Sequence, residues 1–170
     1  MFVDLKKFWL ADKELSIDPD WKRPEKKEFA RLIAPIDIDG VTIEGIFFTI
    51  SANIYMPDRL VTFQMEYQSR EYPRGVPMVR FEWRPQSPHN NKGLGPEEYR
   101  FLNISGTHIH PFDLNWEQSE TLVRKGVLPI AIPIIEALNS FEEALAYIEG
   151  CFRIKGVIGL PPPPWTSRMV

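Results

Sequence analysis

Hydrophobic and polar residues alternate along the middle of the chain, with the period of two that is typical of half-buried β-strands. The pattern predicts five strands, at residues 28–36, 41–52, 59–68, 77–84 and 99–110. Asp39-Gly40 has the composition of a tight hairpin turn, and turn-forming residues also separate the third strand from the fourth. Because short turns join antiparallel neighbours, we expect a five-stranded antiparallel meander.

Helical spacing marks the regions before and after these strands. Residues 4–13 place apolar side chains on one face, and Asp4 has the side chain of an N-cap, which predicts an N-terminal helix. Ser140 and Glu143 form a capping box near the other end of the chain. The helix that this box opens has an apolar stripe of Phe141, Ala144, Leu145, Ile148 and Phe152.

Together these elements predict an α+β fold in which C-terminal helices pack on one face of the sheet. Asn115 and Gln118 resemble a second capping box, and they predict a further helix over residues 116–125. We expect one domain over residues 1–158 and a proline-rich tail over residues 159–170. The tail has polyproline II composition, and it can pack on the domain, remain free or meet a partner; packing is the favoured alternative.

Strand alternation assigns side chains to the two faces of the sheet. The apolar face carries Val61, Phe63, Met65, Tyr67, Val79, Phe81, Trp83 and Ile109. The opposite face carries Glu66, Arg80, Glu82, Arg84, His108 and His110. Because the helices cover the apolar face, we expect the polar face to be an open surface and the candidate site.

Composition narrows the class of protein. The chain has 170 residues, of which 44% are hydrophobic and 25% charged, as in a folded globular domain. A net charge of -3 produces no overall attraction to nucleic acid, so RNA binding would have to be local. A single cysteine excludes an internal disulfide, and the sequence suggests neither a signal peptide nor a membrane span. We therefore expect a cytoplasmic protein.

All three histidines of the chain lie between positions 89 and 110. Imidazoles titrate near neutral pH, so His108 and His110 are candidates for the base and the acid of RNA cleavage. Arg80 is the candidate clamp for the phosphate, and His89 is a candidate third participant from a long loop. Either Glu66 or Glu82 can orient an imidazole, and Glu82 is taken as the site residue. These five residues predict a metal-independent endoribonuclease without a cofactor.

Three short motifs carry a resemblance. The runs Arg80-Phe81-Glu82, Pro88-His89-Asn90-Asn91 and Gly106-Thr107-His108-Ile109-His110 resemble a family of uncharacterised bacterial and phage proteins with PH-x-N and GTH-x-H motifs. A similar arrangement occurs in small ribonuclease toxins of the TumE type. The resemblance covers residues 80–154. It implies a toxin–antitoxin or mobile-element ribonuclease, with RNA as its substrate and an antitoxin or host protein as its partner.

Two alternatives use other chemistry. In the first, His108, His110, His89 and Asp113 bind zinc or another borderline metal ion. In the second, the chain is a non-enzymatic interaction protein of a phage or mobile element, whose acidic body and proline-rich tail bind a protein. The histidines would then form an ordinary solvated surface.

Overall fold

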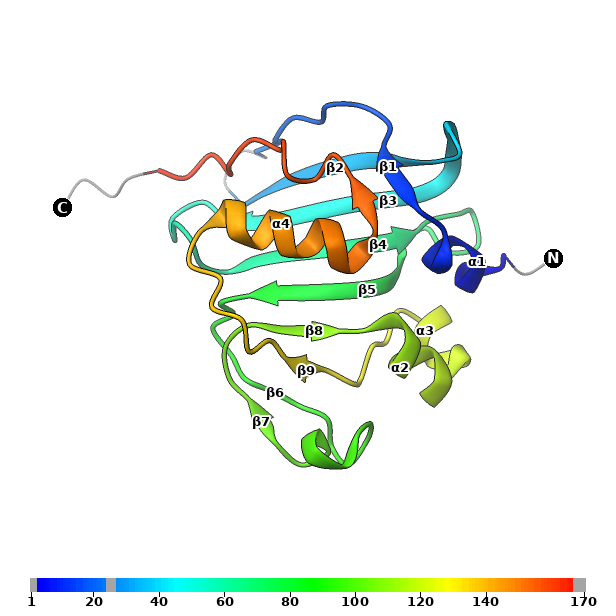
Figure 1. Ribbon diagram of the computed structural model, residues 1–170, viewed down its shortest axis with the longest axis vertical. Helices are drawn as coiled ribbons and strands as arrows, with labels where there is room; N and C mark the ends of the chain where they lie inside the picture. The colour runs from blue at the N-terminus through cyan, green and yellow to red at the C-terminus, as the bar shows by residue number, and fades with distance from the viewer. Residues whose placement is uncertain (1–2, 24–26, 167–170) are drawn as a thin grey trace.

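The computed structural model describes residues 3–23 and 27–166. It has an α+β fold in which most strands belong to one large, mostly antiparallel sheet (Figure 1). The eight strands of this sheet follow the order β10-β1-β2-β3-β4-β5-β8-β9. They are β1 (Lys13–Leu15), β2 (Phe29–Ile38), β3 (Val41–Asn53), β4 (Val61–Tyr67), β5 (Val76–Trp83), β8 (His108–His110), β9 (Ile132–Pro133) and β10 (Ile154–Lys155). The β1–β10 pair is parallel. The prediction of a wholly antiparallel sheet of five strands was therefore wrong in the number of strands and in the direction of this pair.

The four long strands β2 to β5 form the predicted meander. Asp39 and Gly40 both have positive φ angles, of 52° and 72°, and they connect β2 to β3 in a tight turn. The added strands β1, β9 and β10 have two or three residues each. Such short strands show no period of two, and their partners lie far away in the sequence, which is why alternation did not reveal them.

The predicted fifth strand over residues 99–110 is confirmed at its end, in β8 (His108–His110), but residues 99–107 do not belong to this sheet. Only β8 joins the large sheet, while β7 (Asn103–Ile104) pairs with β6 (His89–Asn90) in a separate two-stranded sheet. A short 3-10 helix, η1 (Glu97–Tyr99), lies between β6 and β7. Gly106, with a φ angle of +83°, interrupts the extended backbone before β8. We call residues 89–104 the flap.

The terminal helices begin where the sequence predicts. α1 (Leu5–Leu10) is capped by Asp4, whose Oδ1 accepts a hydrogen bond from the Lys7 backbone N–H at 3.1 Å. α4 (Phe141–Phe152) is capped by Ser140, whose Oγ accepts a hydrogen bond from the Glu143 N–H at 3.2 Å. α1 ends sooner than expected, because the chain turns at residues 11–12 and enters β1.

The predicted helix over residues 116–125 is divided in two. α2 (Phe112–Gln118) ends at Ser119, and the Ser119 side chain caps α3 (Glu120–Arg124). Asn115 lies inside α2 and is fully buried, so its assignment as an N-cap was wrong.

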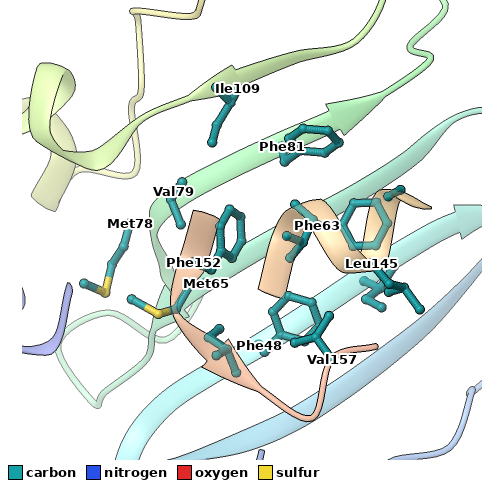
Figure 2. Packing of buried hydrophobic residues seen from close by; sticks show 14 of the residues in the cluster. Phe48, Phe63, Met65, Met78, Val79, Phe81, Ile109, Leu145, Phe152 and Val157 are labelled. Atoms are coloured by element: carbon teal, nitrogen blue, oxygen red, sulfur yellow. The ribbon is translucent and has the colours of Figure 1, made fainter. Parts of the chain in front are cut away.

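The hydrophobic core lies between the sheet and α4, which lies in front of the long strands (Figure 1). Figure 2 shows Phe48, Phe63 and Phe81 from the strands beside Leu145 and Phe152 of α4. All five side chains are buried. This packing closes the apolar face, as the alternation predicted, and leaves the polar face of β4, β5 and β8 to other segments.

The described part of the tail, through Thr166, packs on the domain. The Trp165 ring lies 5.8 Å from the Phe141 ring, and the Thr166 N–H donates to the Ile54 carbonyl at 2.9 Å. The tail residues 167–170 lie outside the described residues.

No helix within residues 3–23 and 27–166 is both long and apolar enough to cross a membrane.

Candidate functional site

Strand pairing brings four of the predicted site residues to one place. β5 and β8 are antiparallel neighbours in which Glu82 pairs with His108 and Arg80 pairs with His110. The Nε2 atom of His108 lies 3.6 Å from Glu82 Oε2, and the Nε2 atom of His110 lies 3.7 Å from Glu82 Oε1. One carboxylate therefore faces two imidazoles, each through a different oxygen.

This cluster is not on an open surface, which corrects the expectation for the polar face. His108 is 1% exposed and His110 is 3% exposed. The flap brings His89 against both rings, and the segment that follows α3 contacts His110 from another side. About a quarter of the Glu82 side chain, 27%, stays exposed, so the cluster meets solvent on the carboxylate side.

Backbone carbonyls orient both imidazoles. His108 Nδ1 lies 2.8 Å from the Gly106 carbonyl oxygen, and His110 Nδ1 lies 2.8 Å from the Leu128 carbonyl oxygen. Because a carbonyl only accepts hydrogen bonds, Nδ1 is the donor in each ring. In the neutral rings Nε2 then carries a lone pair, and both Nε2 atoms are buried without a hydrogen-bond partner among the described residues.

Burial makes both rings poor bases toward protons. Burial, followed by the charges of His89 and Arg80, lowers the pKa of His110 to about 3. Burial also lowers the pKa of His108, although the Gly106 carbonyl and the Glu82 carboxylate oppose this effect. Both shifts favour the neutral ring, in which Nε2 carries a lone pair.

His89 completes a cluster of three imidazoles. Its ring centroid lies 4.7 Å from that of His110 and 5.8 Å from that of His108. Its Nε2 donates to the Pro129 carbonyl at 2.9 Å. The flap thus brings the third histidine to the other two, as the predicted role of a loop participant requires.

Arg80 lies beside the cluster at the edge of a cavity. Its Nε donates to Gln64 Oε1 at 3.1 Å, and its Nη1 lies 3.9 Å from Glu82 Oε1. The cavity has a volume of about 400 Å³, and Arg80, Glu82, His89 and His110 line it together with flap residues and residues 126–129. Lys92 adds a second cation to its wall.

Other sequence candidates lie elsewhere. Arg84 has a φ angle of 49°, leaves the strand, and donates to the carbonyls of Asp58, Leu138 and Asn139. Asp113, the expected fourth metal ligand, accepts a hydrogen bond from Trp9 Nε1 at 3.0 Å. Both assignments to the site were therefore wrong.

The cluster has the composition of a metal site. One donor atom from each of Glu82, His108 and His110 lies within 4.8 Å of the other two, and these are nitrogen and oxygen ligands that zinc and similar ions prefer. Backbone carbonyls bound to the second ring nitrogen are the usual support of histidine ligands. Sequence reasoning missed the carbonyls of Leu128 and Pro129, since a backbone oxygen has no signature in the sequence.

Comparison with known proteins found no matching family model, no matching curated protein and no matching solved structure. The resemblance to TumE-type toxins therefore stays a prediction, and the functional argument rests on the chemistry of the site.

Proposed function

We propose that the protein is a metal-dependent enzyme that cleaves phosphodiester bonds in RNA, with one divalent ion bound by Glu82, His108 and His110. The convergence of two buried Nε2 lone pairs on a single carboxylate carries the proposal. Three electron-pair donors that face one another repel unless a proton or a cation lies between them. The Nδ1 hydrogen bonds direct both Nε2 lone pairs toward Glu82, and this geometry favours a metal ion.

A site with three protein ligands leaves coordination positions for water and substrate. A divalent ion held by Glu82, His108 and His110 would lower the pKa of a bound water toward neutrality and so supply the nucleophile. In hydrolysis the water oxygen forms a bond to phosphorus, the bond from phosphorus to the leaving oxygen breaks, and a water proton ends on that oxygen. Metal-free cleavage by His108 and His110 is less well supported, because it needs one of these two rings protonated near neutral pH.

The charge of the cavity supports an anionic substrate. Arg80 uses its Nε for Gln64, its Nη1 lies 3.9 Å from Glu82 Oε1, and the residue lines the cavity. A guanidinium there can bind two phosphate oxygens at once and stabilise the charge that develops during cleavage. RNA in particular is favoured by the resemblance of the histidine motifs to ribonuclease toxins.

The proposal is tested by RNA cleavage with the metal-free protein before and after zinc, manganese or cobalt is added. We expect cleavage only with metal, and its loss in Glu82→Gln and in His108→Ala/His110→Ala. Glu149→Gln is the matched control, because Glu149 lies on α4, across the sheet from the histidines, and its Oε2 accepts a hydrogen bond from the Ile158 N–H at 3.0 Å. Equal cleavage by the metal-free and metal-loaded protein would overturn the proposed role of the metal.

The second candidate, a protein-interaction role in the cytoplasm with an antitoxin or host protein as partner, is favoured by one feature of the flap. Phe101 is 81% exposed, and Leu102 beside it is also exposed. The described part of the proline-rich tail is packed and supports this role less well. Phe101→Ser/Leu102→Ser should abolish capture of a partner without changing metal binding, and unchanged capture would exclude the flap as the interface.

A further inference from the structure

Residues 128–131, here called the strap, lie just before β9 in the segment that connects α3 to β9 (Figure 1). Hydrogen bonds join the strap to the histidine cluster. The first half of the strap orients two imidazoles. The Leu128 carbonyl accepts a hydrogen bond from His110, and the Pro129 carbonyl accepts one from His89. The positions of these two carbonyl groups therefore decide where two of the three imidazoles point.

The second half of the strap is held from α2 by Asn115. The Asn115 carboxamide forms two hydrogen bonds with Ile130, one to its carbonyl and one from its N–H, both at 2.9 Å. Its Nδ2 also donates to the Pro111 carbonyl at 2.8 Å. Asn115 and Ile130 are both buried, so water cannot replace these hydrogen bonds.

Asn91, on the flap, holds the next residue of the strap in the same way. Its carboxamide donates to the Ala131 carbonyl at 2.9 Å and accepts from the Ala131 N–H at 2.8 Å. Its Nδ2 also donates to the Tyr99 carbonyl at 3.2 Å. Asn91 and Ala131 are buried as well.

We propose that Asn91 and Asn115 are positioning residues of the metal centre, which act through the strap on His89 and His110. The inference rests on the proposed function, because it assigns a support to that same metal site. Neighbouring residues of an extended chain direct their N–H and C=O groups to opposite sides. The carboxamides of Asn115 and Asn91 bind two consecutive strap residues from opposite sides. They therefore fix the position and the rotation of the strap backbone, including the carbonyl groups of Leu128 and Pro129.

His108 provides an internal comparison. Its Nδ1 donates to Gly106, which does not belong to the strap. Loss of either asparagine should therefore disturb the ring of His110 and leave the ring of His108 in its present tautomer. If the two asparagines only joined loops, their loss would lower the stability of the fold without affecting His110 more than His108.

The experiment uses the full chain and its Asn115→Ala, Asn91→Ala and Asn53→Ala variants. Asn53 is the matched control, since it is a buried asparagine whose Oδ1 accepts from the Tyr55 backbone N–H outside the site. We expect Asn115→Ala and Asn91→Ala to bind Zn²⁺ about 10- to 100-fold more weakly, as is usual when outer-sphere support is lost. The visible spectrum of their Co²⁺ forms should change, and Asn53→Ala should keep the affinity and spectrum of the wild type.

Nitrogen-15 NMR of the imidazoles reports the tautomers in the metal-free protein. We expect His110 to lose its pure Nδ1–H tautomer in Asn115→Ala and to recover part of it in Asn115→Asp, which keeps the acceptor for the Ile130 N–H. Folded Asn115→Ala and Asn91→Ala proteins with wild-type affinity, Co²⁺ spectrum and His110 tautomer would overturn the inference. If the wild type binds neither ion, the proposed function fails and the positioning role fails with it; equal binding by wild type and variants refutes the positioning role alone.

Discussion

Lys13 is a buried cation whose replacement tests the electrostatics of the fold. The residue begins β1 and is 2% exposed. Its ammonium group donates to the carbonyls of Phe8, Trp9 and Ala11. Burial and, after it, the Arg153 charge lower the pKa of Lys13 to about 8, against the opposing charge of Asp12. Lys13→Met removes the titrating group and keeps most of the apolar stem.

The sign of the pH effect follows from proton binding. The unfolded chain keeps the Lys13 proton up to its ordinary pKa of 10.5, whereas the folded chain releases it near pH 8. Between these values the unfolded state binds more protons, so this lysine makes the fold more stable as the pH rises. From pH 7.5 to pH 9.5 the contribution of the wild-type residue grows by about 2 kcal/mol.

The assay is urea unfolding of the wild type and of Lys13→Met at both pH values. Other groups titrate alike in the two proteins, so their contributions cancel in the difference between the two free energies of unfolding. That difference should move by about 2 kcal/mol in favour of the wild type at the higher pH. A constant difference would refute the reasoning, and it would show that the three carbonyl acceptors keep Lys13 charged.

Three further changes have defined outcomes. Phe152→Ala removes a buried ring that packs 6.2 Å from Phe48, and urea unfolding should show a loss of about 3 to 5 kcal/mol; a loss below about 1 kcal/mol would contradict this packing. Gly45→Ala should destabilise by about 2 kcal/mol or more, because Gly45 has a φ angle of +83° and an added Cβ would collide with the Gln68 carbonyl; near-wild-type stability would contradict this. Burial raises the pKa of Cys151 to about 11, so alkylation of the folded protein at pH 8 should be about 100-fold slower than after unfolding, and equal rates would contradict this.

Sequence periodicity predicted the parts of the fold that have local causes. β2 to β5 follow alternation, and α4 follows its Ser140 cap and its apolar stripe. β1 and β10 join through parallel pairing of residues about 140 positions apart, and their three and two residues have no period to detect. Asn115 was misassigned for a different reason. Its residue type predicted a helix N-cap, but it lies inside α2, where its side chain binds the strap.

The sequence predicted which side chains form the site, but not the segments that bury them. Alternation placed Glu82, His108 and His110 on one face, and the structure brings them together. Burial of the histidines depends on the flap and the strap, whose contacts are made by backbone carbonyls and two asparagines. A carbonyl group is present at every residue, so nothing in the sequence distinguished the Leu128 carbonyl from any other. The change from an expected open acid–base surface to a candidate metal centre follows from these contacts.

The central claim, that Glu82, His108 and His110 bind one divalent ion, is tested most directly by anomalous X-ray diffraction at the zinc edge from crystals grown with zinc. The account predicts one strong peak among these residues, about 2.0 to 2.2 Å from both Nε2 atoms and from a Glu82 oxygen. Crystals of Glu82→Gln grown in the same way should lack this peak or show it much weakened. Wild-type crystals with no peak at this position, or with zinc only on other surface groups, would contradict the account.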